Sequence, residues 1–226
     1  RSTLFPYTTL FRSQPLCWRC DHPLLNYATS SWFIKVSAIK KQLLEANQKI
    51  NWLPAHFRDG RMGDWLENVR DWAISRGRYW GTPIPIWQNQ DGEYLCIGSQ
   101  ATLEKLVGHQ VPDLHKHFVD QLVIEKDGKK YQRIPEVFDC WFESGSMPFF
   151  SKHFPADFIS EGQDQTRGWF YTLLVLAVAL ENQSSYKNVL VNGVILAEDG
   201  KKMSKKLQNY PNPEMIFHQY GADARG

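Results

Sequence analysis

Apolar residues follow helical spacing in the first half of the chain. Between residues 36 and 50, apolar side chains at Val36, Ile39 and Leu43 recur close to the period of a helix, which predicts an amphipathic helix. The segment 62–75 predicts a second helix, followed by a turn or the start of a strand. Both helices have an apolar side to bury, so each needs a sheet or another helix to pack against.

The longest uncharged apolar run, GWFYTLLVLAVAL, covers residues 168–180. Its thirteen residues are too few to cross a bilayer, so the run predicts a buried core helix. The strand-like segments FIS and NVLVNGVIL stand before and after it. Apolar strands that alternate with a buried helix predict an α/β fold with a parallel sheet.

Polar segments follow both predicted strands. EGQDQTRGW follows FIS, and AEDGKKMSKK follows NVLVNGVIL. Ligands of open parallel sheets bind outside the carboxyl ends of the strands, so we expect the two segments to share a site. The stretch 88–134 is more polar and contains DGEY and KDGKK turns, which indicates an inserted subdomain.

Composition narrows the class of protein. The 226 residues suffice for one large domain or two small ones. The net charge of +2 creates no overall field toward nucleic acid or membrane, so we expect neither DNA nor membrane as a partner. No secretory signal is visible. The four cysteines show no disulfide framework, which favours a cytoplasmic protein.

The first thirteen residues, RSTLFPYTTLFRS, do not read as part of the fold. They contain no acidic residue and nearly repeat TLF, and they match a translated sequencing adaptor. We therefore exclude residues 1–13 from the fold. A genuine basic N-terminal arm is the alternative.

The segment EGQDQTRGW has two interpretations. Glu161 and Asp164 could complement the positive end of the following helix. Alternatively, Gln165 and Trp169 share a helix face and place an ammonium acceptor beside an aromatic wall, as a site for an apolar amino acid requires. Trp141, in DCWFESGS, is either a core residue or a second wall of that pocket.

The lysine-rich segment DGKKMSKK does not match a P-loop. Gly200 could act as a hinge that lets the four following lysines, Lys201, Lys202, Lys205 and Lys206, reach a triphosphate. A solvated lysine turn is the alternative.

Two further segments also allow two interpretations. Cys17 and Cys20 in CWRC have the spacing of half a zinc site, or are simply structural cysteines. RDWAISRGRYWGTPIPIW could contact RNA or could be a rigid loop that packs on the core, and packing is favoured. Its interleaved basic and aromatic residues are Arg70, Trp72, Arg76, Arg78, Tyr79 and Trp80.

Taken in order, these segments resemble the class I aminoacyl-tRNA synthetases and, within them, the isoleucyl enzymes. The resemblance extends from Gln14 to the C-terminus. It is carried by CWRCDHPL, SWF, DWAISRGRYWGTPIPIW, VFDCWFESGSMPF, EGQDQTRGWFYTLL, VNGVILAEDGKKMSKK and NYPNP. A valyl or leucyl enzyme is a narrower alternative, and a non-catalytic RNA-binding module is the alternative from another class.

The resemblance implies a reaction in which isoleucine and ATP, with Mg2+, give isoleucyl-adenylate and pyrophosphate, after which the acyl group moves to tRNA(Ile). KMSKK resembles the family's KMSKS signature, with Lys206 in place of the final Ser. This match implies that Lys202 and Lys205 act on the triphosphate. It also implies that Ile195, Met203 and Ser204 bind ATP.

For the amino acid, the resemblance implies that Glu161, Asp164 and Gln165 hold the ammonium group and the adenylate. Trp141 and Trp169 would form the isoleucine pocket. Isoleucine against valine is the usual worked example of how modestly one methylene discriminates, so the resemblance also implies a separate editing step. Zn2+ would bind Cys17 and Cys20 together with an upstream cysteine pair.

The sequence also departs from the family. It contains no HxGH signature, and the editing residues are absent. We therefore expect an internal piece that is inactive alone. After residues 1–13 its expected parts are the closing edge of the editing insertion (14–52), the second half of a Rossmann-like catalytic domain (53–210) and the start of a helical connection (211–226). The catalytic part would include the insertion near 88–134 and the lysine loop at 202–206.

Overall fold

The computed structural model describes residues 15–17, 20, 22–25, 30–194, 196–198, 200, 203, 208–221 and 223. The chain divides into two units, Arg1–Trp32 and Phe33–Gly226, and each is described by itself. In the first unit, Leu16 and Pro23 form an antiparallel bridge, and the backbone N–H of Cys17 donates to the carbonyl of His22 at 2.8 Å.

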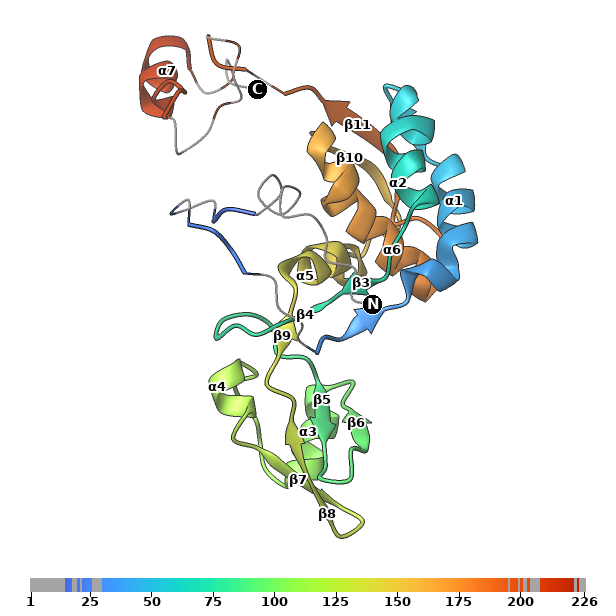
Figure 1. The fold of residues 1–226 in the computed structure, drawn as a ribbon, viewed down its shortest axis with the longest axis vertical. Helices are drawn as coiled ribbons and strands as arrows, with labels where there is room; N and C mark the ends of the chain where they lie inside the picture. The colour runs from blue at the N-terminus through green and yellow to red at the C-terminus, as the bar shows by residue number, and fades with distance from the viewer. Residues whose placement is uncertain are drawn as a thin grey trace, which may run out of the picture. The chain divides into compact units, whose positions relative to one another are not determined.

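The centre of the second unit is a parallel sheet of three strands in the order β10–β11–β2. The strands span Asn51–Leu53 (β2), Ala156–Gly162 (β10) and Tyr186–Asn192 (β11). The helices α1 (Lys40–Gln48), α2 (Gly63–Glu67) and α6 (Trp169–Glu181) gather beside this sheet in Figure 1 and share one apolar core with it. The predicted α/β class with a parallel sheet is confirmed.

The long apolar run forms α6, and the prediction of a buried core helix is confirmed. Every residue from Phe170 to Val178 is buried. The helix ends at Asn182, which adopts the left-handed conformation that often closes helices. Tyr186 on β11 lies beneath it and donates its hydroxyl to the carbonyl of Phe170 at 3.1 Å.

The other two helices differ from the prediction in extent. The segment expected as one helix over 36–50 begins as a 3-10 helix, Val36–Ile39, before α1. The second helix ends early, because Asn68 turns its side-chain amide onto the carbonyl of Asp64 at 2.9 Å. Beyond it the chain enters the short strand β3 (Trp72–Ala73), which pairs with β1 (Phe33–Ile34).

A separate antiparallel sheet forms between residues 86 and 133, in the order β6–β5–β8–β7. Its strands are β5 (Ile86–Gln88), β6 (Tyr94–Cys96), β7 (Val123–Lys126) and β8 (Lys129–Arg133). The helices α3 (Gln100–Val107) and α4 (Lys116–Val119) lie between β6 and β7 in the sequence. Both predicted turns are present, since Gly92 has φ +82° and Asp127–Gly128 joins β7 to β8 with positive φ at both residues. This sheet has its own core, which includes Trp87 and Ile124.

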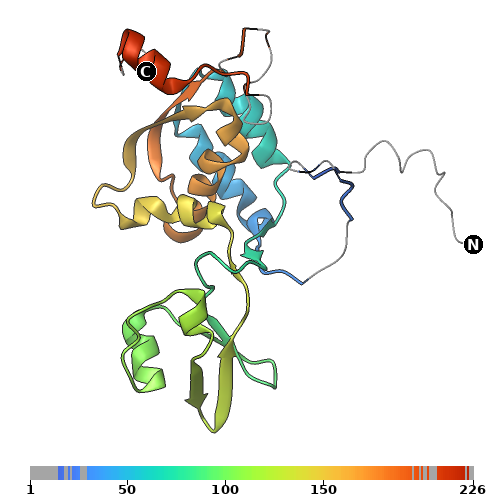
Figure 2. The ribbon, with the colours of Figure 1, turned by 90° about the vertical axis from the view of Figure 1, so that its left-hand side faces the viewer.

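Two short strands connect this antiparallel sheet to the rest of the unit. β4 (Ser75–Arg76) pairs antiparallel with β9 (Val137–Phe138). Figure 2 shows these two strands close together above the antiparallel sheet. Immediately after β9 the chain forms α5 (Cys140–Ser146), which continues as the 3-10 helix Met147–Phe150. A further helix, α7 (Pro213–Tyr220), begins at the cap Asn212.

One face of the parallel sheet carries apolar side chains that the described residues leave uncovered. Phe158, Leu190 and Leu53 are 58%, 38% and 47% exposed, and Leu190 and Leu53 are direct register partners. On the opposite face, Val189 and Trp52 are buried in the core. Parallel sheets are normally covered on both faces, so this face is suited to receive further chain. None of the described helices is long and apolar enough to traverse a bilayer.

Burial of tyrosines in this core predicts a loss of stability at alkaline pH. Burial, with a smaller effect from Asp71, raises the pKa of Tyr171 to about 12. The ordinary pKa is about 10, so the stability gained from keeping this phenol neutral is complete below pH 10 and is lost as the pH rises toward 12. The free energy of unfolding of Tyr171→Phe minus that of the wild type should therefore rise by about 1 kcal/mol between pH 8 and pH 11.

Urea unfolding of both proteins at pH 8 and pH 11, followed by circular dichroism, measures this difference. Tyr186→Phe is the comparison, because it also loses the hydrogen bond to Phe170 and should destabilise the chain by about 1 kcal/mol at pH 8. The same pH dependence for Tyr171→Phe and the wild type would contradict the assignment.

Candidate functional site

The two polar segments leave neighbouring strands at the same edge of the parallel sheet. Gly162, the last residue of β10, is the register partner of Asn192, the last residue of β11. The Asn192 amide donates to the hydroxyl of Ser160 at 3.1 Å, which ties the two strand ends together. The structure thus brings the start of EGQDQTRGW, and the point where the chain leaves β11 toward the lysine segment, to the edge where parallel sheets bind ligands.

Gln165 does not share a helix face with Trp169, so that expectation is wrong. Gln165 lies in a 3-10 helix, Gln163–Arg167, and Gly168, with φ −145° and ψ −119°, separates it from α6. Its side-chain oxygen accepts the backbone N–H of Trp169 at 2.8 Å. The first turn of a helix has unpaired N–H groups, and Gln165 satisfies one of them.

The polar groups of this segment remain available to a ligand. The Gln165 amide donates to Asp164 at 3.3 Å, and its carbonyl oxygen keeps a second lone pair beyond the one used at Trp169. Glu161 and Asp164 are exposed. Three acceptor side chains therefore lie within five consecutive residues at the end of β10.

The two tryptophans come from different helices. Trp169 begins α6, is half-buried and donates its indole N–H to the carbonyl of Ser144 on α5 at 3.0 Å. Trp141, near the start of α5, is 40% exposed, so the structure does not place it in the core. A Cβ atom at Gly168 would stand 2.6 Å from the Gln165 side-chain oxygen and 3.4 Å from Cη2 of Trp141. Trp141 and Gln165 therefore both lie close to Gly168.

The helix α5 and the residues that hold it were missed by the sequence reasoning. Gly145 lets α5 approach α6 closely, since a Cβ there would stand 3.0 Å from the backbone of Thr172. Asp139, just before α5, is buried and bonded to Trp72 and Arg76. The one available signal was a carboxylate next to the aromatic pair in DCWF.

The basic and aromatic stretch from Arg70 to Trp80 divides into two parts. Trp72 and Arg76 bond Asp139, so packing is the correct interpretation for them. Tyr79 and Trp80 are 72% and 70% exposed, and packing on the core is wrong for these two.

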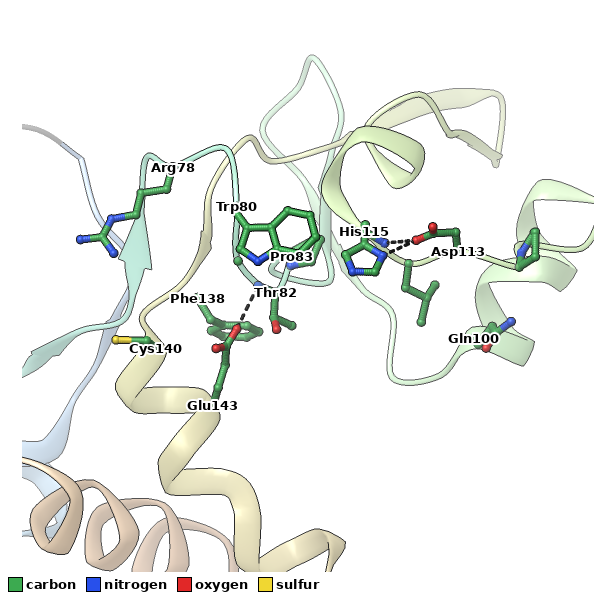
Figure 3. Close-up of a pocket in the computed structure, with 13 residues that line it drawn as sticks. Arg78, Trp80, Thr82, Pro83, Gln100, Asp113, His115, Phe138, Cys140 and Glu143 are labelled. Carbon is green, nitrogen blue, oxygen red and sulfur yellow. Dashed lines mark hydrogen bonds and ion pairs between the residues drawn. The ribbon is translucent and has the colours of Figure 1, made fainter. Parts of the chain in front are cut away.

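Trp80 borders a cleft of about 820 Å³, shown in Figure 3. Its ring stacks on His115 with centroids 5.0 Å apart, and Nδ1 of His115 lies 2.6 Å from Oδ1 of Asp113. The backbone N–H of His115 donates to the Asp113 carboxylate at 2.7 Å. This bond, together with the His115 ring, holds the pKa of Asp113 below its usual range. Across the cleft, Glu143 of α5 accepts the backbone N–H of Thr82 at 2.9 Å.

Several predicted residues cannot be placed. Four of them lie outside the described residues: Ile195, Lys202, Ser204 and Lys205. Met203 of the lysine loop is described and is half-buried. The roles predicted for these residues therefore stay predictions.

The CWRC pair does not form a metal site on its own. Cys17 is half-buried, Cys20 is exposed, and the carbonyl of Cys20 lies 3.1 Å from Nδ1 of His22. Within the part of the chain that the structure describes, no three His, Cys, Asp or Glu side chains are arranged to hold a metal. Two thiolates are half of a tetrahedral zinc site.

Comparison with known proteins assigns the chain to a family. A family model described as "tRNA synthetases class I (I, L, M and V)" matches residues 24–225. The chain is 57% identical to the isoleucine–tRNA ligase of Chlamydia abortus, 55% to that of Chlamydia caviae and 54% to that of Chlamydia pneumoniae. Each match covers 98% of this chain and 22% of the relative, so the chain spans about a fifth of their length.

Solved structures agree on the fold. A ternary complex of the Agrobacterium radiobacter K84 leucyl enzyme with tRNA and LeuAMS matches 75% of this chain and 26% of its own, at TM-score 0.52 and 19% identity. The Mycobacterium tuberculosis methionyl-tRNA synthetase bound by methionyl-adenylate matches 93% of this chain and 35% of its own, at TM-score 0.54 and 19% identity. At this identity the likeness concerns the fold alone.

The close contacts of Gly168 predict the effect of enlarging it. Gly168→Ala would force the Gln165 oxygen away from the backbone N–H of Trp169 and remove a helix cap, at a cost of about 1 kcal/mol in the free energy of unfolding. Gly193→Ala is the matched control, because a Cβ there meets no atom within 4 Å. Urea unfolding compares the two variants, and equal stability would contradict the packing of Gln165.

Proposed function

Because the chain belongs to the class I tRNA synthetases of the isoleucine, leucine, methionine and valine group, we propose that it forms the amino-acid half of an isoleucine-activating site. The observation that carries the proposal is the close approach of both Trp141 and Gln165 to Gly168, just beyond the carboxyl end of β10. The identity of the amino acid rests on relatives that are isoleucine–tRNA ligases and are 54–57% identical to the chain.

The side chains at this edge suit an apolar amino acid. The ammonium group binds the acceptor oxygens of Glu161, Asp164 and Gln165, which all lie at the end of β10 or just beyond it. The indoles of Trp141 and Trp169 exclude water from the aliphatic side chain, whose burial stabilises the complex by about 25 cal/mol per Å². Charged acceptors at one end and apolar walls at the other fix the orientation of the substrate.

In the proposed reaction, an oxygen of the isoleucine carboxylate bonds to the α-phosphorus of ATP while the bond from that phosphorus to pyrophosphate breaks. The acyl group then moves from the adenylate to tRNA(Ile). Mg2+ accompanies ATP and shields its phosphates. Lys202 and Lys205 bind the triphosphate, and donors of this kind contribute about 3–4 kcal/mol where charge develops. Met203, Ser204 and Ile195 complete the ATP contacts.

The uncovered face of the parallel sheet supports the further proposal that this site is completed by chain outside the sequence. Phe158, Leu190 and Leu53 would be buried against it. The division proposed from the sequence belongs to the same account: an editing-domain edge over 14–52, a catalytic half over 53–210 and a helical connection from 211. Zn2+ in the intact enzyme would need two ligands in addition to Cys17 and Cys20, since no three described residues are arranged to hold a metal.

One observation favours a second candidate function, a non-catalytic RNA-binding module. Tyr79 and Trp80 are exposed, stack on His117 and His115, and lie next to Arg78, as single-stranded RNA requires. Binding to RNA that weakens steeply with salt, in the absence of any activation activity, would support this alternative.

A chimera tests the proposed activity directly. Residues 24–225 replace the matching segment of the Chlamydia abortus ligase, and ATP–pyrophosphate exchange is measured with isoleucine, valine and leucine. We expect exchange that depends on isoleucine and exceeds that with valine or leucine. The 226-residue chain alone should give none, because its sequence lacks HxGH. A folded chimera without exchange, or one that prefers leucine, would contradict the proposal.

The lysine loop gives a second prediction in the same chimera. Lys202→Ala should lower the exchange rate by about a hundred- to a thousandfold and leave isoleucine binding nearly unchanged, since the lost cation acts on the leaving pyrophosphate. Lys201→Ala is the matched control, because it removes the adjacent lysine outside the signature. Equal losses from both substitutions would show that the loop contributes only general positive charge.

A further inference from the structure

The geometry of the proposed amino-acid pocket depends on the position of α5. This helix carries Trp141, and its Ser144 carbonyl accepts the indole N–H of Trp169 at 3.0 Å. It also packs through Gly145 directly on the backbone of Thr172 in α6. A small displacement of α5 would move both tryptophan walls relative to Gln165.

The start of α5 is held by a buried carboxylate. Asp139 precedes the helix and is 5% exposed. Its Oδ2 accepts the indole N–H of Trp72 at 3.2 Å and a guanidinium N–H of Arg76 at 2.8 Å. Its backbone N–H donates to the carbonyl of Ile74 at 2.7 Å. Three bonds therefore join this one residue to the segment 72–76.

Arg76 is itself fixed in place. Its second guanidinium nitrogen donates to the carbonyls of Ala73 and Ser75, at 2.9 and 2.8 Å. Its strand β4 pairs with β9, the strand that leads into Asp139. Charge-assisted bonds of this kind are stronger than neutral ones, and removal of the anion leaves a half-buried guanidinium without its counter-charge.

We propose that Asp139 is a positioning residue for isoleucine activation, which acts through Trp72 and Arg76 to hold α5 and the walls of the amino-acid pocket. This inference rests on the proposed function. Asp139 is bonded within the protein and does not touch the amino acid. The lysine loop leaves from β11 and not from α5, so loss of Asp139 affects the amino-acid end of the site and spares the ATP end.

The kinetic test uses the chimera with Asp139→Asn, which keeps the size of the side chain and removes its charge. The KM for isoleucine in ATP–pyrophosphate exchange should rise about tenfold while the KM for ATP changes less than about twofold. The control is Asp120→Asn, which takes the carboxylate from buried Arg133 in the antiparallel sheet and should leave both KM values within about twofold. If Asp139 had only a structural role, the substitution would reduce the amount of active enzyme. The maximal rate would then fall while the KM values for isoleucine and ATP stay unchanged.

Trp72→Phe provides a second variant, because it removes the N–H that donates to Asp139 and keeps an aromatic ring near Phe142 of α5. It should raise the isoleucine KM by about threefold, and it decides the question if Asp139→Asn does not fold. Unchanged KM values, or equal changes for isoleucine and ATP, would overturn the proposal.

Hydrogen exchange separates this inference from the activity itself. In Asp139→Asn or Trp72→Phe the backbone amides of Cys140–Ser146 should exchange faster by about tenfold, while those of α3 keep their rates. Unchanged exchange in α5 would overturn the role of Asp139, whether or not the chimera is active. If the unmodified chimera shows no ATP–pyrophosphate exchange, that result counts against the proposed function and not against the role of Asp139.

Discussion

The parallel pairing of β10 with β11 is the constraint on which the rest of the site depends. Since both strands run in the same direction, their last residues, Gly162 and Asn192, stand side by side, and the chain leaves both strands at one edge. The pairing is fixed by burial: Val189 lies in the core beneath α6, so a slip of one residue would turn the apolar positions of β11 outward. The core therefore determines which strand ends stand together at this edge.

On this edge the proposed amino-acid pocket is assembled from helices and not from the sheet alone. Gly145 and Gly168 permit the close approach of α5, α6 and the Gln165 side chain, and any larger residue would separate them. The arrangement places half-exposed indoles beside acceptor oxygens, which is a suitable combination for a molecule with one apolar and one cationic end. Asp139 connects α5, which carries Trp141, to the strands β4 and β9 that lead to the antiparallel sheet.

Sequence patterns predicted the features that depend on local period and turn chemistry. The uninterrupted run of α6 indicated a buried helix, and the Asp-Gly pairs indicated turns, because the cause of each lies within a few residues. The helix α5 and the bonds of Asp139 could not be predicted in this way. Trp72 and Asp139 are far apart in the sequence, and no periodicity reports that their side chains meet. The same holds for Gln165, whose position follows from the unpaired N–H of Trp169 and not from helical spacing.

The most direct test of the site is a crystal structure of the chimera with a non-hydrolysable analogue of isoleucyl-adenylate. The account predicts that the isoleucyl side chain lies between the indoles of Trp141 and Trp169, with its ammonium group in hydrogen-bonding distance of Gln165 or Glu161. An analogue bound elsewhere, with Trp141 turned away from Gly168, would contradict it.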